Sequence, residues 1–368
     1  MDDAGRATEL RRGWTTGACA TAATKAAFLA LLTGDFPEPV EIVLPRGERP
    51  AFALAITATG DGFARAGIVK DAGDDPDVTH GALIISTVRF AAPGAGVVFV
   101  AGPGVGTVTK PGLPLPVGEP AINPVPRRLM REVVAELAAA HGVEADVVVE
   151  ISIPDGERIA THTWNGRLGI VGGLSILGTT GVVIPYSCAA WITSIHQGID
   201  VARAAGHHHV AGCTGSTSEA AVQARLGLPD SAMLDMGDFA GALLKHLRRR
   251  PIPRLTIGGG FAKLSKLAVG HLDLHSGRSQ VDLDHLARTL AELGADEDVV
   301  DRARHANTAL EVLGLAGPLA GRLADAIARD AQVVARDVLA DAPVEVDVLV
   351  VDRTGQIIGS SGPAGSNL

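Results

Sequence analysis

The sequence predicts a two-domain α/β protein, and three observations support this prediction. The chain has 368 residues, more than one ordinary hydrophobic core accommodates. Short apolar runs separated by turn residues follow one another up to about residue 160, whereas strand-like and helix-like segments alternate after it. We therefore expect an N-terminal α+β domain with a mixed or antiparallel sheet over residues 1–160. Residues 161–368 are expected to form a Rossmann-like, parallel α/β domain with an added helical segment.

The first domain is expected to begin with a helix. Thr15 and Thr16 precede an alanine-rich run that ends before Gly34, which fits a hydroxyl N-cap and a left-handed glycine C-cap. A second helix is predicted from Pro126 to His141, after an irregular glycine- and proline-rich stretch. The other apolar runs predict strands, the first five of them arranged as a meander. These runs are 40–44, 52–56, 63–69, 82–88, 97–100 and 147–153.

In the second domain, alternating strand and helix patterns are typical of a parallel sheet with right-handed crossovers. The strand candidates are 182–184, 209–211, 232–234, 255–257 and 344–351. The helical patterns are 187–205, 218–226, 238–249 and 260–270, followed by several between 284 and 340. We expect the helices of this last stretch to form a structural buttress.

Charge and cysteine content exclude several classes of protein. The net charge is −9, with 32 basic against 41 acidic residues, so a nucleic-acid partner is not expected. Cys19, Cys188 and Cys213 are too few and too scattered for a disulfide framework. The first 13 residues are charged and lack an apolar core, and no apolar run reaches the ~18 residues that span a bilayer. The sequence therefore predicts a cytoplasmic protein without membrane contact.

Three glycine-containing segments each lead from a predicted strand into a predicted helix. They are Cys213–Glu219, Asp235–Phe239 and Gly258–Phe261. Ligands of open parallel sheets bind beyond the carboxyl ends of the strands, where glycines permit close approach and helix starts offer N–H donors. Together the segments predict a ligand cleft, although turn geometry alone explains any one of them. None matches a P-loop or a dinucleotide fingerprint.

The segment 70–80 carries four carboxylates, of which Asp71 and Asp74 are candidate catalytic groups. These side chains suit a cation or the polar groups of a substrate, and they equally suit an acidic turn in which Asp side chains bond their own backbone. The calcium-hand spacing is missing. We expect no metal held by the protein itself.

Two other constellations have a catalytic and a structural interpretation. His271 would share a helix face with His275 if the helix 260–270 continued, which would suit proton transfer or structural hydrogen bonding. Cys19 beside Thr15 and Thr16 suits an activated nucleophile, whereas helix capping explains the threonines and small cysteines are often buried.

Several long strings resemble the cobalt-precorrin-5B C1-methyltransferase family (CbiD). In order, they are Arg12–Ala20, Val69–Gly81, Gly102–Gly112, Gly118–Arg127, Arg167–Gly181, Met236–Gly241 and Lys263–His271. The resemblance runs from about Leu10 to Leu286 and is less diagnostic in the helical C-terminal part. Gly166 stands where the family is expected to have proline, and 259–262 also departs from its usual string.

The resemblance implies methylation of C1 of cobalt-precorrin-5B, with S-adenosylmethionine as methyl donor and cobalt arriving inside the corrinoid substrate. Three alternatives stay open: action on a metal-free precorrin, a non-catalytic corrinoid carrier, and a nicotinamide-dependent reductase of the same pathway. Other cobalamin-pathway enzymes and a second copy of the chain are candidate partners.

For the donor we expect the glycine loops of the second domain, with a carboxylate on the ribose by analogy with nucleotide sites. These residues are Gly172, Gly173, Gly178, Thr179, Thr180, Gly181, Thr214, Gly215, Glu219, Asp235 and Asp238. A donor site between the two domains is the alternative. For the carboxylate-rich acceptor we expect polar and basic side chains, each of which also suits an ordinary surface position. These residues are Thr15, Thr16, Lys70, Asp71, Asp75, Lys110, Arg127 and Arg128, with Lys263 and Lys266 as additions.

Overall fold

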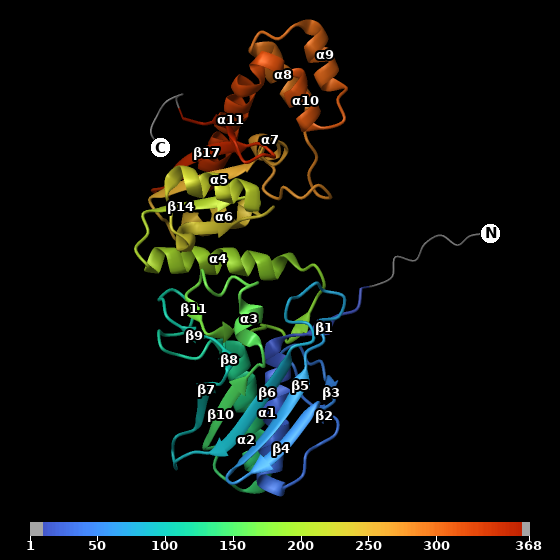
Figure 1. The fold of residues 1–368 in the computed structure, drawn as a ribbon, viewed down its shortest axis with the longest axis vertical. Coiled ribbons are helices and arrows are strands. Elements are labelled where there is room, and N and C mark those ends of the chain that lie inside the picture. The colour runs from blue at the N-terminus through green and yellow to red at the C-terminus, as the bar shows by residue number, and fades with distance from the viewer. Residues whose placement is uncertain (1–9, 363–368) are drawn as a thin grey trace, which may run out of the picture. The chain divides into compact units, whose positions relative to one another are not determined.

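A computed structural model describes residues 10–362, and the chain forms two compact units, Met1–Cys188 (unit 1) and Ala189–Leu368 (unit 2) (Figure 1). The predicted boundary at residue 160 thus lies inside unit 1. Short strand pairs tie the residues after 160 to earlier segments. They are β11 (Ile170–Val171) with β9 (Thr107–Val108), β12 (Gly173–Leu174) with β8 (Gly104–Val105), and β13 (Val182–Val183) with β1 (Gly13–Trp14). The predicted strand 182–184 therefore belongs to unit 1 and not to the parallel sheet.

The main sheet of unit 1 is mixed, with strand order β4–β5–β6–β10–β7. The strands are β4 (Ile56–Gly60), β5 (Phe63–Val69), β6 (Leu83–Phe90), β10 (Val147–Ser152) and β7 (Val97–Ala101). Only the pair β10 and β7 is parallel. The predicted meander holds for β4 to β6, but β10 is inserted between β6 and β7. A short hairpin of β2 (Val40–Glu41) and β3 (Ala51–Phe52) and the small helix α3 (Gly156–Ala160) complete the elements of this unit.

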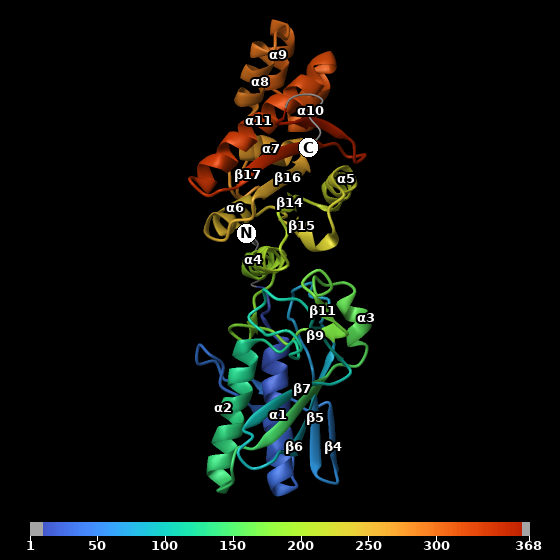
Figure 2. The same ribbon diagram turned by 90° about the vertical axis from the view of Figure 1, so that its left-hand side faces the viewer.

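Two long helices, α1 (Thr16–Thr33) and α2 (Pro124–His141), lie on one face of this sheet (Figure 2). The predicted caps of α1 are confirmed: the Thr15 side chain accepts a hydrogen bond from the Ala18 N–H at 3.2 Å, and Gly34 is left-handed with φ of 87°. Alanines dominate the buried surface of α1, so its backbone can approach the sheet closely.

Helix α1 is also the one helix within residues 10–362 that is long and apolar enough to cross a membrane, with 18 residues and a mean hydropathy of 1.2. The expectation that no apolar run is this long is therefore wrong. However, 72% of that window is buried inside the structure. The helix packs against β5, β6 and α2 and forms the centre of the unit 1 core.

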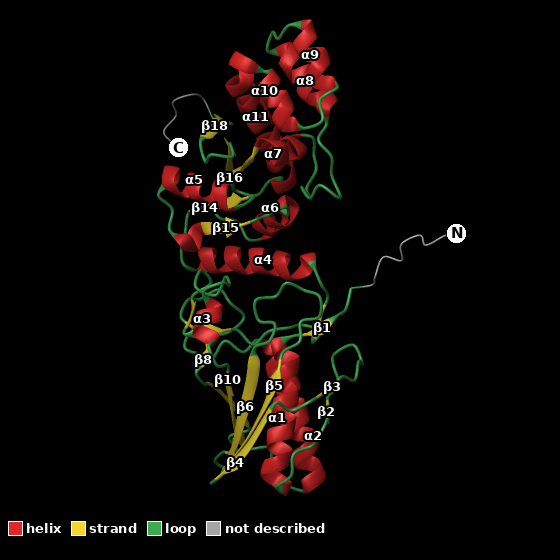
Figure 3. Cartoon of the chain, turned by 45° about the vertical axis from the view of Figure 1, so that its right-hand side comes forward, coloured by secondary structure: helices red, strands yellow, loops and turns green. Residues whose placement is uncertain are grey.

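Unit 2 contains a five-stranded sheet in the order β15–β14–β16–β17–β18. The strands are β15 (Met233–Asp235), β14 (His209–Cys213), β16 (Arg254–Gly260), β17 (Glu345–Val351) and β18 (Ile357–Ser360). The first four are parallel, which confirms the predicted parallel sheet, and β18 adds an unpredicted antiparallel edge. Helices connect the parallel strands (Figure 3). They include α5 (Ser216–Leu226), α6 (Ala240–Arg249) and α7 (Phe261–Ala268), with the 3-10 turn η1 (Asp230–Ala232) before β15, whereas α4 (Cys188–Ala204) precedes β14.

The stretch between β16 and β17 is helical, as predicted. It comprises α8 (Leu283–Glu292), α9 (Glu297–Arg304), α10 (Ala309–Leu315), the turn η2 (Gly317–Leu319) and α11 (Ala320–Leu339). Helix α11 packs on α7, β17 and β18, and its buried residues share one apolar cluster with the sheet. These helices are therefore part of the unit 2 core.

Candidate functional site

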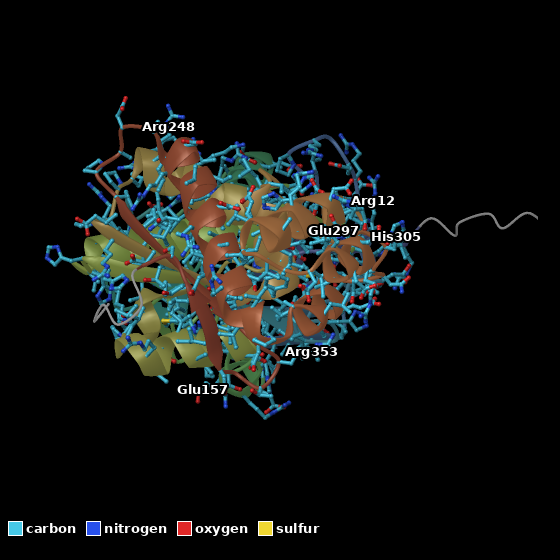
Figure 4. All side chains as sticks on the ribbon, turned by 90° about the horizontal axis from the view of Figure 1, so that it is seen from above. Arg12, Glu157, Arg248, Glu297, His305 and Arg353 are labelled. Atoms are coloured by element: carbon cyan, nitrogen blue, oxygen red, sulfur yellow. The ribbon has the colours of Figure 1, made fainter. Side chains whose placement is uncertain are left out.

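Unit 2 has a cavity of about 410 Å³ at the carboxyl edge of its parallel sheet. Strand register places Cys213 beside both Asp235 and Gly258, so the segments that follow these strands start at one edge. The three predicted glycine loops thus start from one edge of the sheet, although only the first and the third line the cavity. The turn between β17 and β18 adds Asp352 and Arg353 to the cavity wall (Figure 4 labels Arg353).

One side of the cavity is polar and built from the starts of α5 and α7. Its polar side chains are Thr214, Ser216, Thr217, Ser218 and Lys263. The first N–H groups of a helix have no partner inside the helix, so two helix starts offer donors here. This side suits the polar or anionic part of a ligand.

The apolar part of the lining comes mostly from segments distant in sequence. It consists of Leu310 and Leu313 of α10, Val351 at the end of β17 and Ile358 of β18, together with Phe261 of α7. Leu310 is 43% exposed and therefore leaves contact area for a ligand. No signal in the sequence predicted this wall, because apolar residues at helical spacing predict packing in a core.

Lys263 connects the cavity to the second glycine loop, Asp235–Phe239. Its Nζ donates a hydrogen bond to the Thr214 carbonyl oxygen at 2.9 Å. The same nitrogen lies 3.0 Å from Asp238 Oδ1, an ion pair without hydrogen-bond geometry. Asp238 therefore belongs to the surroundings of the cavity, although it does not line it.

The predicted donor residues are divided between the two units. Thr214 and Gly215 line the cavity of unit 2, and Glu219, Asp235 and Asp238 lie near the same sheet edge without lining it. The other six lie in unit 1, outside this cavity. They are Gly172, Gly173, Gly178, Thr179, Thr180 and Gly181.

In unit 1, the segment 175–181 is fastened to the start of α1. Thr16 Oγ1 accepts a hydrogen bond from the Leu177 N–H at 2.9 Å, and the Thr15 N–H donates to the Gly181 carbonyl at 2.9 Å. At Gly178, a Cβ atom would lie 2.3 Å from Thr15 Oγ1. These contacts give Thr15, Thr16 and Gly178 a structural role. Cys19 is buried in the same helix, and burial raises the pKa of its thiol to about 12, so it is not an activated nucleophile.

The acidic segment 70–80 is held by internal ion pairs. The Lys70 side chain, 2% exposed, forms an ion pair of 2.7 Å with Asp77. Burial opposes ionisation of Asp77, but the Lys70 ammonium and hydrogen bonds from Thr79 outweigh it and lower the pKa of Asp77. Lys70 therefore stabilises this turn and is not free to meet a substrate, contrary to expectation.

Asp71 and Asp74 bind the segment that precedes β1. The Arg11 guanidinium donates two hydrogen bonds to Asp71, one of them from Nη2 to Oδ1 at 3.0 Å, and these bonds lower the pKa of Asp71 to about 2. The Arg11 N–H donates to Asp74 Oδ2 at 2.6 Å, and the Tyr186 N–H donates to Asp75 Oδ1 at 2.7 Å. Asp71 and Asp74 thus act as anchors, and nothing in this geometry supports proton transfer.

The basic candidates of unit 1 differ in their surroundings. Arg127 donates to the Ile122 carbonyl at 2.7 Å, to Glu119 at 2.8 Å and to the Pro120 carbonyl at 3.0 Å. These hydrogen bonds hold the loop that precedes α2 in place. Arg128 is exposed and lies 3.8 Å from Glu132, and Lys110 is half-buried over Gly169.

His271 is exposed and lies beyond the end of α7 at Ala268, so the predicted shared helix face with His275 does not form. Lys266 is buried and donates to the Leu274 carbonyl at 3.0 Å. Within residues 10–362, no group of three or more His, Cys, Asp or Glu side chains is placed to hold a metal ion.

Comparison with known proteins places these features in a family. The CbiD family model matches residues 3–185, and the model of the CbiD C-terminal domain matches residues 273–362. The chain is 66% identical to the cobalt-precorrin-5B C(1)-methyltransferase of Paramagnetospirillum magneticum, over 96% of this chain and 98% of that protein. It is 64% identical to the protein of the same name from Rhodospirillum rubrum, over 98% of this chain and all of that protein (100%).

A solved structure of cobalamin biosynthesis protein CbiD from Archaeoglobus fulgidus is 30% identical and has a TM-score of 0.40, covering 73% of this chain and 83% of that one. The sequence matches extend over both units, from the segment around β1 and the acidic turn to the helices and strands that close the cavity of unit 2. By these matches, the chain belongs to the CbiD family.

Proposed function

We propose that this chain is a cobalt-precorrin-5B C1-methyltransferase that uses S-adenosylmethionine as methyl donor and a cobalt-corrinoid as acceptor. The observation that carries the proposal is the 66% identity with a relative of that name over 96% of the chain. A fold alone does not determine substrate, cofactor or reaction.

The donor site is proposed to be the cavity of unit 2, which would act as a Rossmann-like ligand domain. Its volume of about 410 Å³ lies within the range of roughly 300–1,000 Å³ that is typical of small-molecule sites. Hydroxyl groups of Thr214, Ser216 and Thr217 suit the ribose, and the apolar wall suits the adenine. Of the residues predicted for the donor, Thr214 and Gly215 take part directly, and Asp238 takes part through Lys263.

When bound, S-adenosylmethionine supplies a methyl group on a sulfonium, which is already a strong leaving group. The contribution of the chain is to bind and align the two substrates and to exclude water, effects that supply ~7–11 kcal/mol in favourable cases. No nucleophilic side chain is required, which agrees with the buried and protonated state of Cys19.

Acceptor contacts are proposed on unit 1. Since Arg127 and Lys70 are used internally, Arg128 and Lys110 are the predicted basic side chains that stay accessible to corrinoid carboxylates. The cytoplasmic location, a homo-oligomer and further pathway partners stay predictions.

The test is a turnover assay with cobalt-precorrin-5B and S-adenosylmethionine labelled in its methyl group. We expect one label per corrinoid at C1 and stoichiometric S-adenosylhomocysteine. Tight corrinoid binding without transfer of label would favour the carrier alternative, and transfer only to the metal-free ring would reassign the acceptor.

A further inference from the structure

Few charged side chains line the unit 2 cavity. Lys263 and Arg353 carry positive charge and Asp352 carries negative charge, while Asp238 pairs with Lys263 from outside the lining. A hydrogen bond from the Thr354 hydroxyl, together with backbone N–H donors, lowers the pKa of Asp352 and keeps it ionised at neutral pH. With one of its two cations already paired to a carboxylate, this lining is only weakly positive and suits a zwitterion with one carboxylate better than a polyphosphate.

Lys263 is the cation best placed to bind that carboxylate. Two protein oxygens, the Thr214 carbonyl and Asp238 Oδ1, hold its ammonium in place at 2.9 and 3.0 Å. A lysine ammonium has three N–H donors and the Thr214 carbonyl takes one of them, which leaves a donor for a ligand in the cavity that this side chain lines. Arg353 is exposed in a turn, and ordering its long side chain on a ligand would cost conformational entropy.

The apolar wall then determines which way the ligand lies. Leu310, Leu313 and Ile358 come from α10 and β18, whereas Lys263 and the hydroxyl groups come from the starts of α7 and α5. An amphiphilic ligand places its flat apolar part against the leucines and its charged end at Lys263.

We propose that Lys263 is a specificity-determining residue that binds the α-carboxylate of the methyl donor, while Leu310, Leu313 and Ile358 cover the adenine. This inference rests on the proposed function, because it assigns the ends of the donor within the cavity. Asp238 acts as a positioning residue that holds the Lys263 ammonium toward Thr214.

Two ligands that differ in the amino-acid end test the assignment by calorimetric titration of the full chain. S-adenosylhomocysteine carries the carboxylate, and 5′-methylthioadenosine lacks the amino-acid end altogether. A charge-assisted hydrogen bond is worth about 1.5–3 kcal/mol, so Lys263→Met should weaken S-adenosylhomocysteine binding about 10- to 150-fold. Binding of 5′-methylthioadenosine should change less than about threefold, since that ligand does not reach Lys263.

Two control variants separate charge recognition from general damage. Lys245→Met makes the same change at an exposed position of α6 outside the cavity and should leave both affinities unchanged. Lys263→Arg keeps the charge and should retain the preference for S-adenosylhomocysteine even if Lys263→Met folds poorly.

The outcomes distinguish the inference from the function on which it rests. If both ligands bind and Lys263→Met weakens them equally or not at all, the assignment of Lys263 is overturned while the donor site stands. The assignment of Lys263 would likewise be overturned if Lys263→Arg also lost the preference for S-adenosylhomocysteine over 5′-methylthioadenosine. If the unaltered chain binds neither ligand, with or without a corrinoid, the proposed donor function fails and the inference fails with it.

Discussion

The Lys70 ammonium lies 2.7 Å from the Asp77 carboxylate, and the Lys70 side chain is 2% exposed. A charge so far from water is stable only while its partner is present. The pair closes the turn that joins β5 to β6. Through hydrogen bonds of Asp71 and Asp74, this turn also holds the segment that precedes α1. Two sequence strings, one at the N-terminus and one around the acidic turn, are therefore a single structural assembly.

Removing the carboxylate of this pair should destabilise unit 1. We expect Asp77→Asn to lower the free energy of unfolding by about 3 kcal/mol. This is the lower end of the range for removing one partner of a buried ion pair, because Asp77 is partly exposed. The double variant Lys70→Met/Asp77→Asn removes the stranded charge and should be more stable than the single variant. Urea unfolding of both variants is the measurement, and a double variant no more stable than the single one would contradict this interpretation.

The Arg11–Asp71 pair should make part of the stability of unit 1 depend on pH. Its folded-state pKa of about 2 lies below the ordinary value of about 3.9. Stability from ionised Asp71 is therefore fully present above the ordinary pKa and is lost as the pH falls toward the folded-state pKa. We expect the stability difference between the unaltered chain and Asp71→Asn to shrink between about pH 4 and pH 2. A stability difference that stays constant over this range would show that Arg11 does not lower the pKa of Asp71.

Gly178 should tolerate no side chain, for a structural reason. Its φ is 129°, and a Cβ atom would meet Thr15 Oγ1 at 2.3 Å. We expect Gly178→Ala to cost about 1–3 kcal/mol in thermal unfolding, the range for strained backbone positions. Gly166→Ala is the matched control, since nothing lies within 4 Å of its added Cβ and its φ is not left-handed. Equal destabilisation of both variants would contradict the packing argument.

Arg127 and its neighbour Arg128 should respond very differently to loss of charge. Arg127→Met removes three hydrogen bonds to the loop before α2 and should lower stability by about 2–4 kcal/mol. Arg128→Met should change stability by less than about 0.5 kcal/mol, because it breaks only an exposed pair. Differential scanning calorimetry compares the two, and similar losses would refute the structural role given to Arg127.

Much of the fold follows from local signals in the sequence. The caps of α1 at Thr15 and Gly34 and the parallel strands around Cys213 and Gly258 depend on short-range chemistry and on strand-to-helix rhythm. The domain boundary did not follow from such signals. Two-residue strands such as β12 and β13 have no readable period, and their pairing depends on partners far away in the chain.

The site was predictable on one side only. Loops after predicted strands pointed to Thr214 and Gly215, because the carboxyl edge of a parallel sheet is a local consequence of topology. Leu310 and Leu313 gave no comparable signal, since their spacing is that of any amphipathic helix. The charge of Arg127 or Lys70 likewise does not reveal whether its partner is a substrate or the chain itself.

The most direct test of the account is to locate the methyl-donor site by hydrogen–deuterium exchange with and without S-adenosylhomocysteine. We predict slower exchange in the segments 214–218, 260–263 and 351–353, which surround the cavity of unit 2. Exchange in the segment 172–181 of unit 1 should be unchanged. Protection confined to 172–181, with the cavity segments unaffected, would contradict the placement of the donor in unit 2.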